Sequence, residues 1–448
     1  MTNIDYKILK EYLMKMLSCS AYQQDYNSAD HTRELMIAGM GSHVSFNSEQ
    51  ESQSISFLVG NQAPSKTLYI YDEGFDALQN LISHVAGDAD INGKVSLETI
   101  ENHVKDFFVL LKENAQKLDD DHKSLKTLLK GIRKSIHTWI AFVPVDNLFI
   151  DPAKQLNVGG ITMRSANAAV ERLQNLNQSK NEDGTPSDYG MFIVEMIAGQ
   201  FGKSCVCEVP VTCDQNLIRL VAESRVEELL NLLRCYTNEM FGSHTRAFIG
   251  LKGDYAVSAS RGVVGFQRDN PCEFTMQLEN LGAFLPYSLN NARIDELSKD
   301  QTFQRLGEII ASQERSQLDG ALLTAVRWLG RASIETRVPE KLLGAAIALE
   351  VLILDSNSTD NIQDRLARRL AFLLEISLES RKSLKKEVKR LYGLRSKIAH
   401  EGNCHPTTDD AAAMEQLCFR ALRVMTSHSP EWKTKKDFID WAEDHELT

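Results

Sequence analysis

The sequence predicts a multidomain protein in which a mixed α+β N-terminal region is followed by an all-α helical bundle. Its 448 residues exceed what one hydrophobic core ordinarily organises. Short β-rich runs occur before residue 295, whereas almost every segment after about residue 300 has helical apolar spacing and few prolines. We therefore expect mixed α+β domains at 1–150 and 151–295, the second being separate or a continuation of the first, and a helical domain at 300–448.

The first domain is expected to combine long helices with strands. Residues 4–17, 97–118 and 122–142 have the apolar periodicity of amphipathic helices. The runs SISFLV at 54–59 and TLYIYD at 67–72 are β-rich and are separated by turn residues, which predicts two strands.

The second domain is expected to place strands around one long helix at 223–241. Strand-like composition is found in KSCVCEVPV at 203–211, TRAFIGLKG at 245–253 and GVVGFQRD at 262–269. The polar stretch 176–189 contains glycine and proline and is expected to be an exposed loop.

The C-terminal region is expected to form a compact bundle. Its predicted helices are 301–332, 339–355, 361–378, 381–401, 408–427 and a short helix near 430–445. Pro339 suits a first helical turn, and Thr408 with two acids behind it is typical of an N-terminal cap. The run ALEVLIL at 348–354 is apolar nearly all round, so its helix should be central.

Composition restricts the class of protein. The net charge of −11 argues against nonspecific coating of nucleic acid. No run reaches the roughly 18 apolar residues of a membrane helix, and the first residues lack the pattern of a secretion signal. The cysteines are scattered, as is typical of reduced thiols, and no second ligand pair follows Cys205, Cys207 and Cys213 at zinc spacing. We expect a cytoplasmic protein without membrane segment, metal or cofactor.

Charge is concentrated in one helical segment. Residues 381–400 hold eight lysines and arginines against one acid, Glu387. So uneven a distribution on an acidic chain indicates an anionic partner. The alternative is a solvated, lysine-rich helix face.

An arginine interrupts the apolar stripe of the same segment. At 100° per residue, Arg395 lies in the middle of that stripe. The stripe consists of Leu384, Val388, Leu391 and Ile398. A buried guanidinium is costly unless a carboxylate or phosphate pairs with it, and Glu350 is the candidate for a purely structural salt bridge.

His400 lies about 140° round the helix from Arg395, beside the lysines. The two side chains could not easily share a pocket within one chain. Either the helix turns at His400, since Gly402 is a stop signal, or a symmetric dimer brings the motifs of two chains together.

Four short motifs follow one another here. They are Trp328-Leu-Gly330, Ala348-Leu-Glu350, Arg365-Leu-Ala-Arg-Arg369 and Leu391-Tyr-Gly-Leu-Arg-Ser-Lys-Ile-Ala-His400, which ends in an R-x4-6-H pattern. In this order they resemble the Apea-like branch of the HEPN superfamily. The resemblance covers about 300–428 and implies a HEPN-type helical bundle there; it does not extend to 1–295.

The resemblance implies a metal-independent endoribonuclease, usually a homodimer and often a toxin or an effector of antiviral defence against phage. Such an enzyme cleaves RNA, tRNA being one candidate, through the RNA's own 2′-hydroxyl. The N-terminal region would then sense a phage or cellular trigger, or regulate the nuclease.

Residue roles follow from the motif. Arg395 would hold the scissile phosphate and His400 would transfer the proton. Lys397 and Lys389 would guide the RNA backbone. Tyr392 would stack on a base, with packing in the core as the alternative.

One position departs from many active HEPN nucleases, which have Asn, Asp or His directly after the arginine. This chain has Ser396, which can still form hydrogen bonds and which, with Glu350, would support the site. Two alternatives stay open. One is a non-catalytic HEPN dimer that binds RNA or nucleotide as a scaffold, and the other is a structural pair of Arg395 with Glu350 in which His400 has no role.

Overall fold

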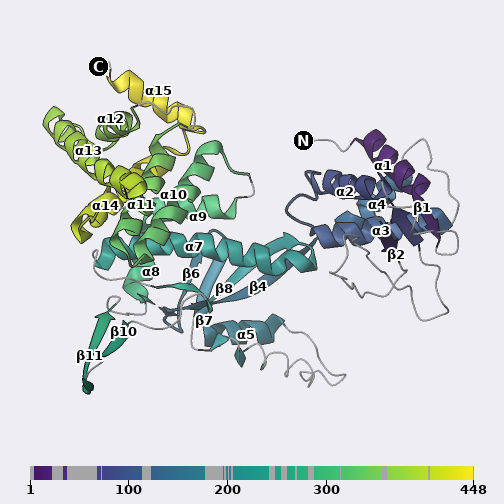
Figure 1. Ribbon diagram of the computed structural model, residues 1–448, viewed down its shortest axis with the longest axis horizontal. Coiled ribbons are helices and arrows are strands. Elements are labelled where there is room, and N and C mark those ends of the chain that lie inside the picture. Colours follow the sequence, from purple (N-terminus) through teal and green to yellow (C-terminus); the bar gives the residue numbers. More distant parts are fainter. Residues whose placement is uncertain are drawn as a thin grey trace. The chain divides into compact units, whose positions relative to one another are not determined.

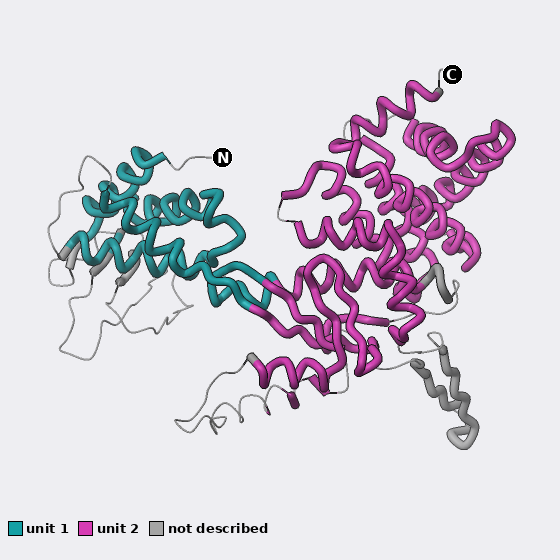
Figure 2. Tube along the Cα trace, turned by 180° about the vertical axis from the view of Figure 1, so that it is seen from behind, with its two compact units in different colours: residues 1–139, 211–221 teal, residues 140–210, 222–448 magenta. Residues whose placement is uncertain are grey.

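The chain is mixed α+β with a helical C-terminal part. The computed structural model describes residues 5–22, 34–37, 68–71, 73–113, 123–176, 195, 198–199, 201–202, 205–241, 248–253, 260–267, 270–280, 287–312, 314–355, 361–401 and 404–446. It divides into two compact units, Met1–Trp139 with Val211–Val221 and Ile140–Pro210 with Ala222–Thr448 (Figure 2). The boundary expected near residue 300 falls inside the second unit.

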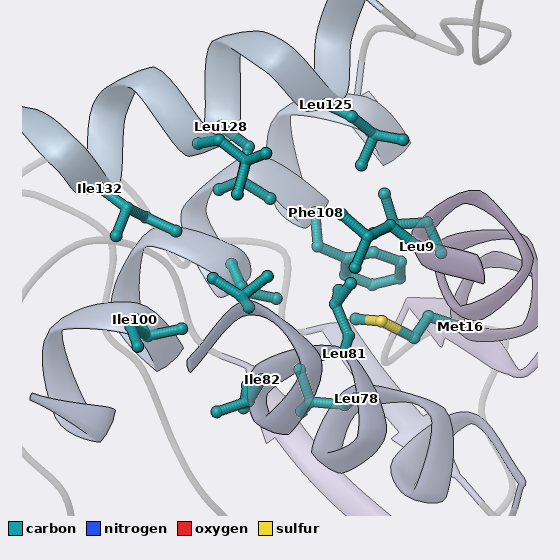
Figure 3. Packing of buried hydrophobic residues seen from close by; sticks show 14 of the residues in the cluster. Leu9, Met16, Leu78, Leu81, Ile82, Ile100, Phe108, Leu125, Leu128 and Ile132 are labelled. Carbon is teal, nitrogen blue, oxygen red and sulfur yellow. The ribbon is translucent and has the colours of Figure 1, made fainter. Parts of the chain in front are cut away.

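The first unit packs four helices around an apolar core. They are α1 (Tyr6–Ser18), α2 (Glu73–Ala86), α3 (Leu97–Glu113) and α4 (Lys123–Lys134). Residues at helical spacing on each helix point into the cluster, among them Leu9, Leu81, Phe108 and Leu128 (Figure 3). Nineteen side chains of this cluster are buried, so the apolar faces account for the packing.

A small antiparallel sheet belongs to the same unit. Its strands are β1 (Ser20–Tyr22), β3 (Leu68–Tyr71) and β2 (Glu34–Ile37), in that order. Strand β3 confirms the prediction at 67–72, whereas the strand predicted at 54–59 lies outside the described residues.

The helix predicted over 122–142 is wrong in its second half. Helix α4 ends at Lys134, and β4 occupies His137–Asp146. β-Branched and aromatic residues in HTWIAFV favour a strand. The Trp139 indole Nε1 donates to the Cys213 carbonyl oxygen at 2.9 Å, a contact with a segment more than 70 residues later.

The second unit contains a five-stranded sheet of order β6-β7-β8-β4-β9. Its further strands are β6 (Gln155–Val158), β7 (Ile161–Ser165), β8 (Cys205–Cys213) and β9 (Gly250–Leu251). Separate pairs are formed by β5 (Leu148–Ile150) with β12 (Tyr287–Leu289) and by β10 (Ser260–Gln267) with β11 (Asn270–Asn280).

Helices cover this sheet. One helix, α5 (Ala166–Leu176), packs on the side of Phe142 and Val206, and the other, α7 (Ile218–Phe241), is held to β8 by Arg225, which donates to the Pro210 carbonyl at 2.8 Å (Figure 1). Almost all of the loop predicted at 176–189 lies outside the described residues.

The bundle forms the rest of this unit. Its helices are α8 (Asn291–Lys299), α9 (Gln301–Ala311), α10 (Gln317–Ile334), α11 (Val338–Ile353), α12 (Ile362–Leu374), α13 (Leu378–Glu401), α14 (Thr408–His428) and α15 (Lys435–Glu446). Helix α11 contacts α10, α12, α13, α14 and α15, which confirms its central position. Pro339 lies in its first turn, as predicted.

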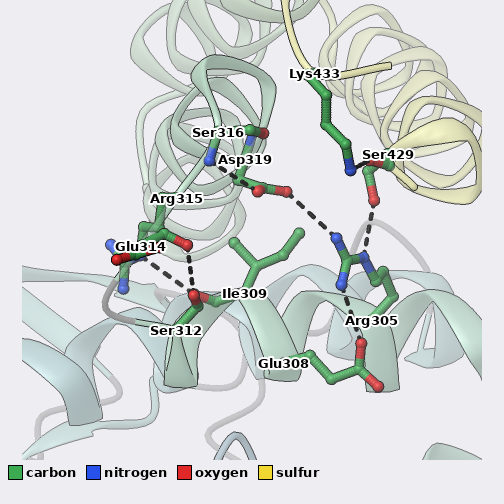
Figure 4. A network of polar contacts seen from close by, with 10 residues as sticks. All are labelled: Arg305, Glu308, Ile309, Ser312, Glu314, Arg315, Ser316, Asp319, Ser429 and Lys433. Atoms are coloured by element: carbon green, nitrogen blue, oxygen red, sulfur yellow. Dashed lines mark hydrogen bonds and ion pairs between the residues drawn. The ribbon is translucent and has the colours of Figure 1, made fainter. Parts of the chain in front are cut away.

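Two helix starts differ from the prediction. The segment 301–332 is two helices, because Ser316 and Asp319 form a capping box that begins α10. Asp319 also forms an ion pair with Arg305 of α9 (Figure 4). The Nε of Arg305 in turn donates a hydrogen bond to the hydroxyl of Ser429, the residue that follows α14 (Figure 4). The cap of α14 is Thr407 rather than Thr408, since Thr407 and Asp410 form the reciprocal bonds.

Close backbone approaches fix the bundle on the rest of the unit. A Cβ at Gly330 of α10 would lie 2.5 Å from the carbonyl oxygen of Asn231 in α7. Gly159, at φ 57°, turns β6 into β7 beneath α9, and its Cβ would lie 2.3 Å from the Gly307 carbonyl. Only glycine allows these contacts without displacement.

Candidate functional site

Helix α13 carries the predicted site residues. Ser377 accepts a hydrogen bond from the Ser380 amide at 3.1 Å, which begins the helix, and Val388 and Leu391 are buried against its neighbours. The helix packs on α12, α11 and α14 and continues to Glu401. It therefore does not turn at His400, and the first of the two routes for joining Arg395 to His400 does not occur.

Arg395 forms a salt bridge with Glu350 of α11. Its Nε lies 2.9 Å from Glu350 Oε1, and its Nη2 donates to Oε2 at 3.3 Å. The two side chains are 22% and 23% exposed, so the pair lies at the rim of the helix interface rather than in its core. Glu350 occupies one edge of the guanidinium, and Nη1 has no hydrogen-bond partner among the described residues.

Tyr392 completes this cluster from the inside. The Arg395 guanidinium lies 5.5 Å from the centre of its ring, and the residue is only 8% exposed. Burial, and then the negative charge of Glu350, raise the pKa of Tyr392 to about 12. The ring belongs to the packing between α11 and α13, which is the alternative to base stacking that the sequence left open.

The lysines of α13 divide into paired and unpaired groups. Lys389 Nζ lies 2.5 Å and Lys385 Nζ 3.4 Å from Asp364 Oδ1 of α12. The hydrogen bond from Lys389 holds the pKa of the Asp364 carboxyl below its usual range. Lys397, by contrast, is exposed and has no ion-pair partner in the described part of the chain.

His400 is exposed on the opposite side of α13 from Arg395, because a continuous helix separates the two residues by about 140°. Ser396 is half-buried between these faces. The chain thus brings together Glu350, Tyr392 and Arg395, and it leaves His400 and Lys397 on the open face. Within one chain, Arg395 and His400 therefore do not face a common pocket.

Several residues of the four short sequence motifs have a structural role in the bundle. Gly330 permits the contact with Asn231. Arg369 is 5% exposed, donates to the Ile353 carbonyl at 3.1 Å and pairs with Asp355 at 3.6 Å. These positions therefore stabilise the packing of the bundle and are not part of the exposed face that carries His400 and Lys397.

Asp364 is the residue of this region that sequence reasoning missed. It pairs with Lys389, which the sequence assigned to guiding RNA, and with Lys385, another of the basic residues counted in 381–400. In the sequence, Asp364 stands directly before the motif 365–369. Its lysine partners lie on another helix, so the sequence did not indicate the pairing.

The cysteines and helices show neither a metal cluster nor a membrane segment in the described residues. No group of three or more His, Cys, Asp or Glu there could hold a metal ion. Cys205, Cys207 and Cys213 are buried, and a hydrogen bond with Cys205, together with burial, raises the pKa of Cys207. None of the described helices combines the length and apolar character needed to cross a membrane.

The chain was compared with protein-family models, with curated proteins and with solved structures. None of the three comparisons gives a match. Function must therefore be inferred from the chain's own residues.

Proposed function

We propose that the protein is a metal-independent endoribonuclease of HEPN type that acts as a homodimer. The observation that carries this proposal is the state of the two motif side chains on α13. Arg395 is held on one edge by Glu350 while Nη1 stays open, and His400 is exposed five residues later. An arginine positioned in this way suits bidentate binding of a phosphate.

The chemistry requires few groups. His400 removes the proton of the RNA 2′-hydroxyl, the 2′-oxygen attacks the adjacent phosphorus, and the bond to the 5′-oxygen breaks. Arg395 stabilises the charge that develops on the phosphoryl oxygens. The 5′-oxygen takes a proton from solvent, so the products are a 2′,3′-cyclic phosphate and a 5′-hydroxyl.

Charge on the open face supports an RNA substrate. Lys382, Lys386 and Lys397 are exposed and have no ion pair among the described residues. They supply the sequence-independent attraction that an RNA backbone requires. Lys389 contributes less, because Asp364 already neutralises it.

A dimer is part of the proposal. Since Arg395 and His400 lie on opposite faces of one helix, a shared phosphate needs the arginine of one chain and the histidine of its partner. The regions before residue 295 would serve as a sensor or regulator that responds to a phage or cellular trigger, as suits a toxin or defence effector in the cytoplasm.

The test is cleavage of total RNA and of tRNA in EDTA by wild type, His400→Ala and Arg395→Ala. We expect wild type to produce 2′,3′-cyclic phosphate ends and each variant to lose about 100-fold or more in rate. His405→Ala is the matched control, because His405 is also exposed and lies five residues beyond His400. Cleavage by His400→Ala at the wild-type rate contradicts the proposal.

A non-catalytic dimer that binds RNA or nucleotide as a scaffold is the second candidate. The separation of Arg395 from His400 within one chain favours it. Binding of RNA by the full chain without cleavage would support this alternative.

A further inference from the structure

A polar groove lies between α7 and α10, both in the second unit. It has a volume of about 470 Å³ and is lined by Glu227 and Glu228 of α7, by Arg327 and Arg331 of α10, and by Arg315 from the connection before α10. We propose that this groove binds a small molecule that carries a phosphate group. The proposal concerns a site away from Arg395 and does not depend on RNA cleavage.

The acidic wall of the groove is already neutralised. Glu228 accepts two hydrogen bonds from Arg315, at 3.1 and 3.0 Å. Glu227 Oε1 accepts from the buried Arg234 at 2.8 Å. Arg315 is fixed further by the carbonyl oxygens of the end of α9, beside the connection seen in Figure 4. The charge of Glu228 is thus balanced by Arg315 and that of Glu227 by Arg234, although Glu227 Oε2 itself has no hydrogen-bond partner among the described residues.

Arg327 and Arg331 are the other two arginines of the groove. Both are exposed, and neither has an ion-pair partner in the described part of the chain. The acid one turn beyond Arg331 is Glu335, whose Oε1 instead accepts from the amides of Thr336 and Arg337, at 2.8 and 3.0 Å. Like charges four residues apart on a helix repel each other, and an anion bound between them offsets this repulsion because it attracts both.

A phosphate fits this pair of guanidinium groups. Each group presents parallel N–H donors to two phosphate oxygens, and the charges are complementary. The volume also lies within the range of about 300–1,000 Å³ typical of small-molecule sites, which leaves space for an organic portion beside the phosphate.

The helices around the groove are fixed before any ligand binds. Gly330, next to Arg331, places the α10 backbone directly against Asn231. Asn231 is 1% exposed, and its Oδ1 accepts from Arg234 at 2.7 Å. A site on such a rigid pair of helices loses little conformational freedom on binding.

Isothermal titration calorimetry of the full chain with ATP, glucose 6-phosphate and inorganic pyrophosphate tests the proposal. We expect at least one probe to bind with a dissociation constant below about 1 mM, and Arg327→Ala/Arg331→Ala to weaken it at least 10-fold. The matched control is Arg337→Ala, which removes an exposed arginine paired with Glu340. Equal binding of pyrophosphate and the organic phosphates would identify the phosphate group as the whole ligand, and preference for an organic phosphate would identify a metabolite.

A second variant narrows the groove without removing charge. Gly320 lines it, and a Cβ added there meets no atom within 4 Å. Gly320→Leu should therefore occupy part of the groove, weaken binding of the organic phosphates and leave the melting temperature equal or higher, since glycine is a poor helix former. Gly320→Ala should bind as wild type does. Absence of binding by wild type to all three probes, or unchanged binding in the double arginine variant or in Gly320→Leu, overturns the proposal.

Discussion

Two salt bridges join opposite sides of α11 to neighbouring helices, and they differ in how far their side chains are exposed to water. Lys341 pairs with Glu415 of α14 at 3.1 Å, and these side chains are 5% and 7% exposed. Glu350, about half a turn away round the helix, pairs with Arg395 of α13 at 2.9 Å, and these side chains are 22% and 23% exposed. The first pair is sealed inside the bundle, whereas the second remains partly exposed to water. This difference in burial predicts different contributions of the two pairs to stability.

The sealed pair should show the largest effect on stability. Lys341→Met leaves the Glu415 carboxylate buried without its cation, and we expect the free energy of unfolding to fall by about 3–5 kcal/mol. The measurement is urea denaturation followed by tryptophan fluorescence, since Trp328, Trp432 and Trp441 lie in the bundle.

The control for this change is Lys341→Met/Glu415→Leu, which removes both charges and should recover most of the loss. A cost below about 1 kcal/mol for Lys341→Met alone would mean that water reaches the pair, and the contrast between the two salt bridges would disappear.

The open pair should contribute much less. Arg395→Ala is expected to lower the free energy of unfolding by about 1 kcal/mol or less, because both partners remain partly hydrated. The coupling free energy of Arg395 with Glu350, measured by a double-mutant cycle with Arg395→Ala and Glu350→Gln, should decrease from 0.1 to about 1 M NaCl, since salt screens exposed charges.

The same cycle on Lys341 and Glu415 provides the comparison, and its coupling should depend far less on salt. A loss of 3 kcal/mol or more for Arg395→Ala would favour the purely structural interpretation of this arginine over a role in binding phosphate.

The sequence was sufficient to predict helices α11 to α14 and the partner of Arg395. Apolar spacing located α11 to α14, and the need of a guanidinium for a carboxylate pointed to Glu350. Both inferences depend on periodicity and charge, which are local or strongly constrained properties.

The errors arose where distant segments decide the outcome. The end of α4 depends on β4 joining β8, more than 70 residues later, and not on the helical pattern that continues through 142. Likewise, Asp364 captures Lys385 and Lys389 from a different helix. The expectation of a buried Arg395 followed from its place in the apolar stripe, but the stripe reaches the rim of the interface at that turn.

Tyr392, which lies beside the Glu350–Arg395 pair, gives the most local test. Its pKa of about 12 in the folded chain exceeds the ordinary value of 10.0, so the folded state holds the phenolic proton more tightly than the unfolded state does. The resulting stabilisation is fully present below pH 10 and is lost as the pH rises through 12. Tyr392→Phe should therefore flatten the fall in the free energy of unfolding between pH 10 and 12.

Tyr287, whose pKa burial also raises to about 12, supplies the control, because Tyr287→Phe should remove a separate part of the same slope. If Tyr392→Phe leaves the slope unchanged, the phenol is hydrated, and the Glu350–Arg395 pair is more open than its exposed fractions indicate.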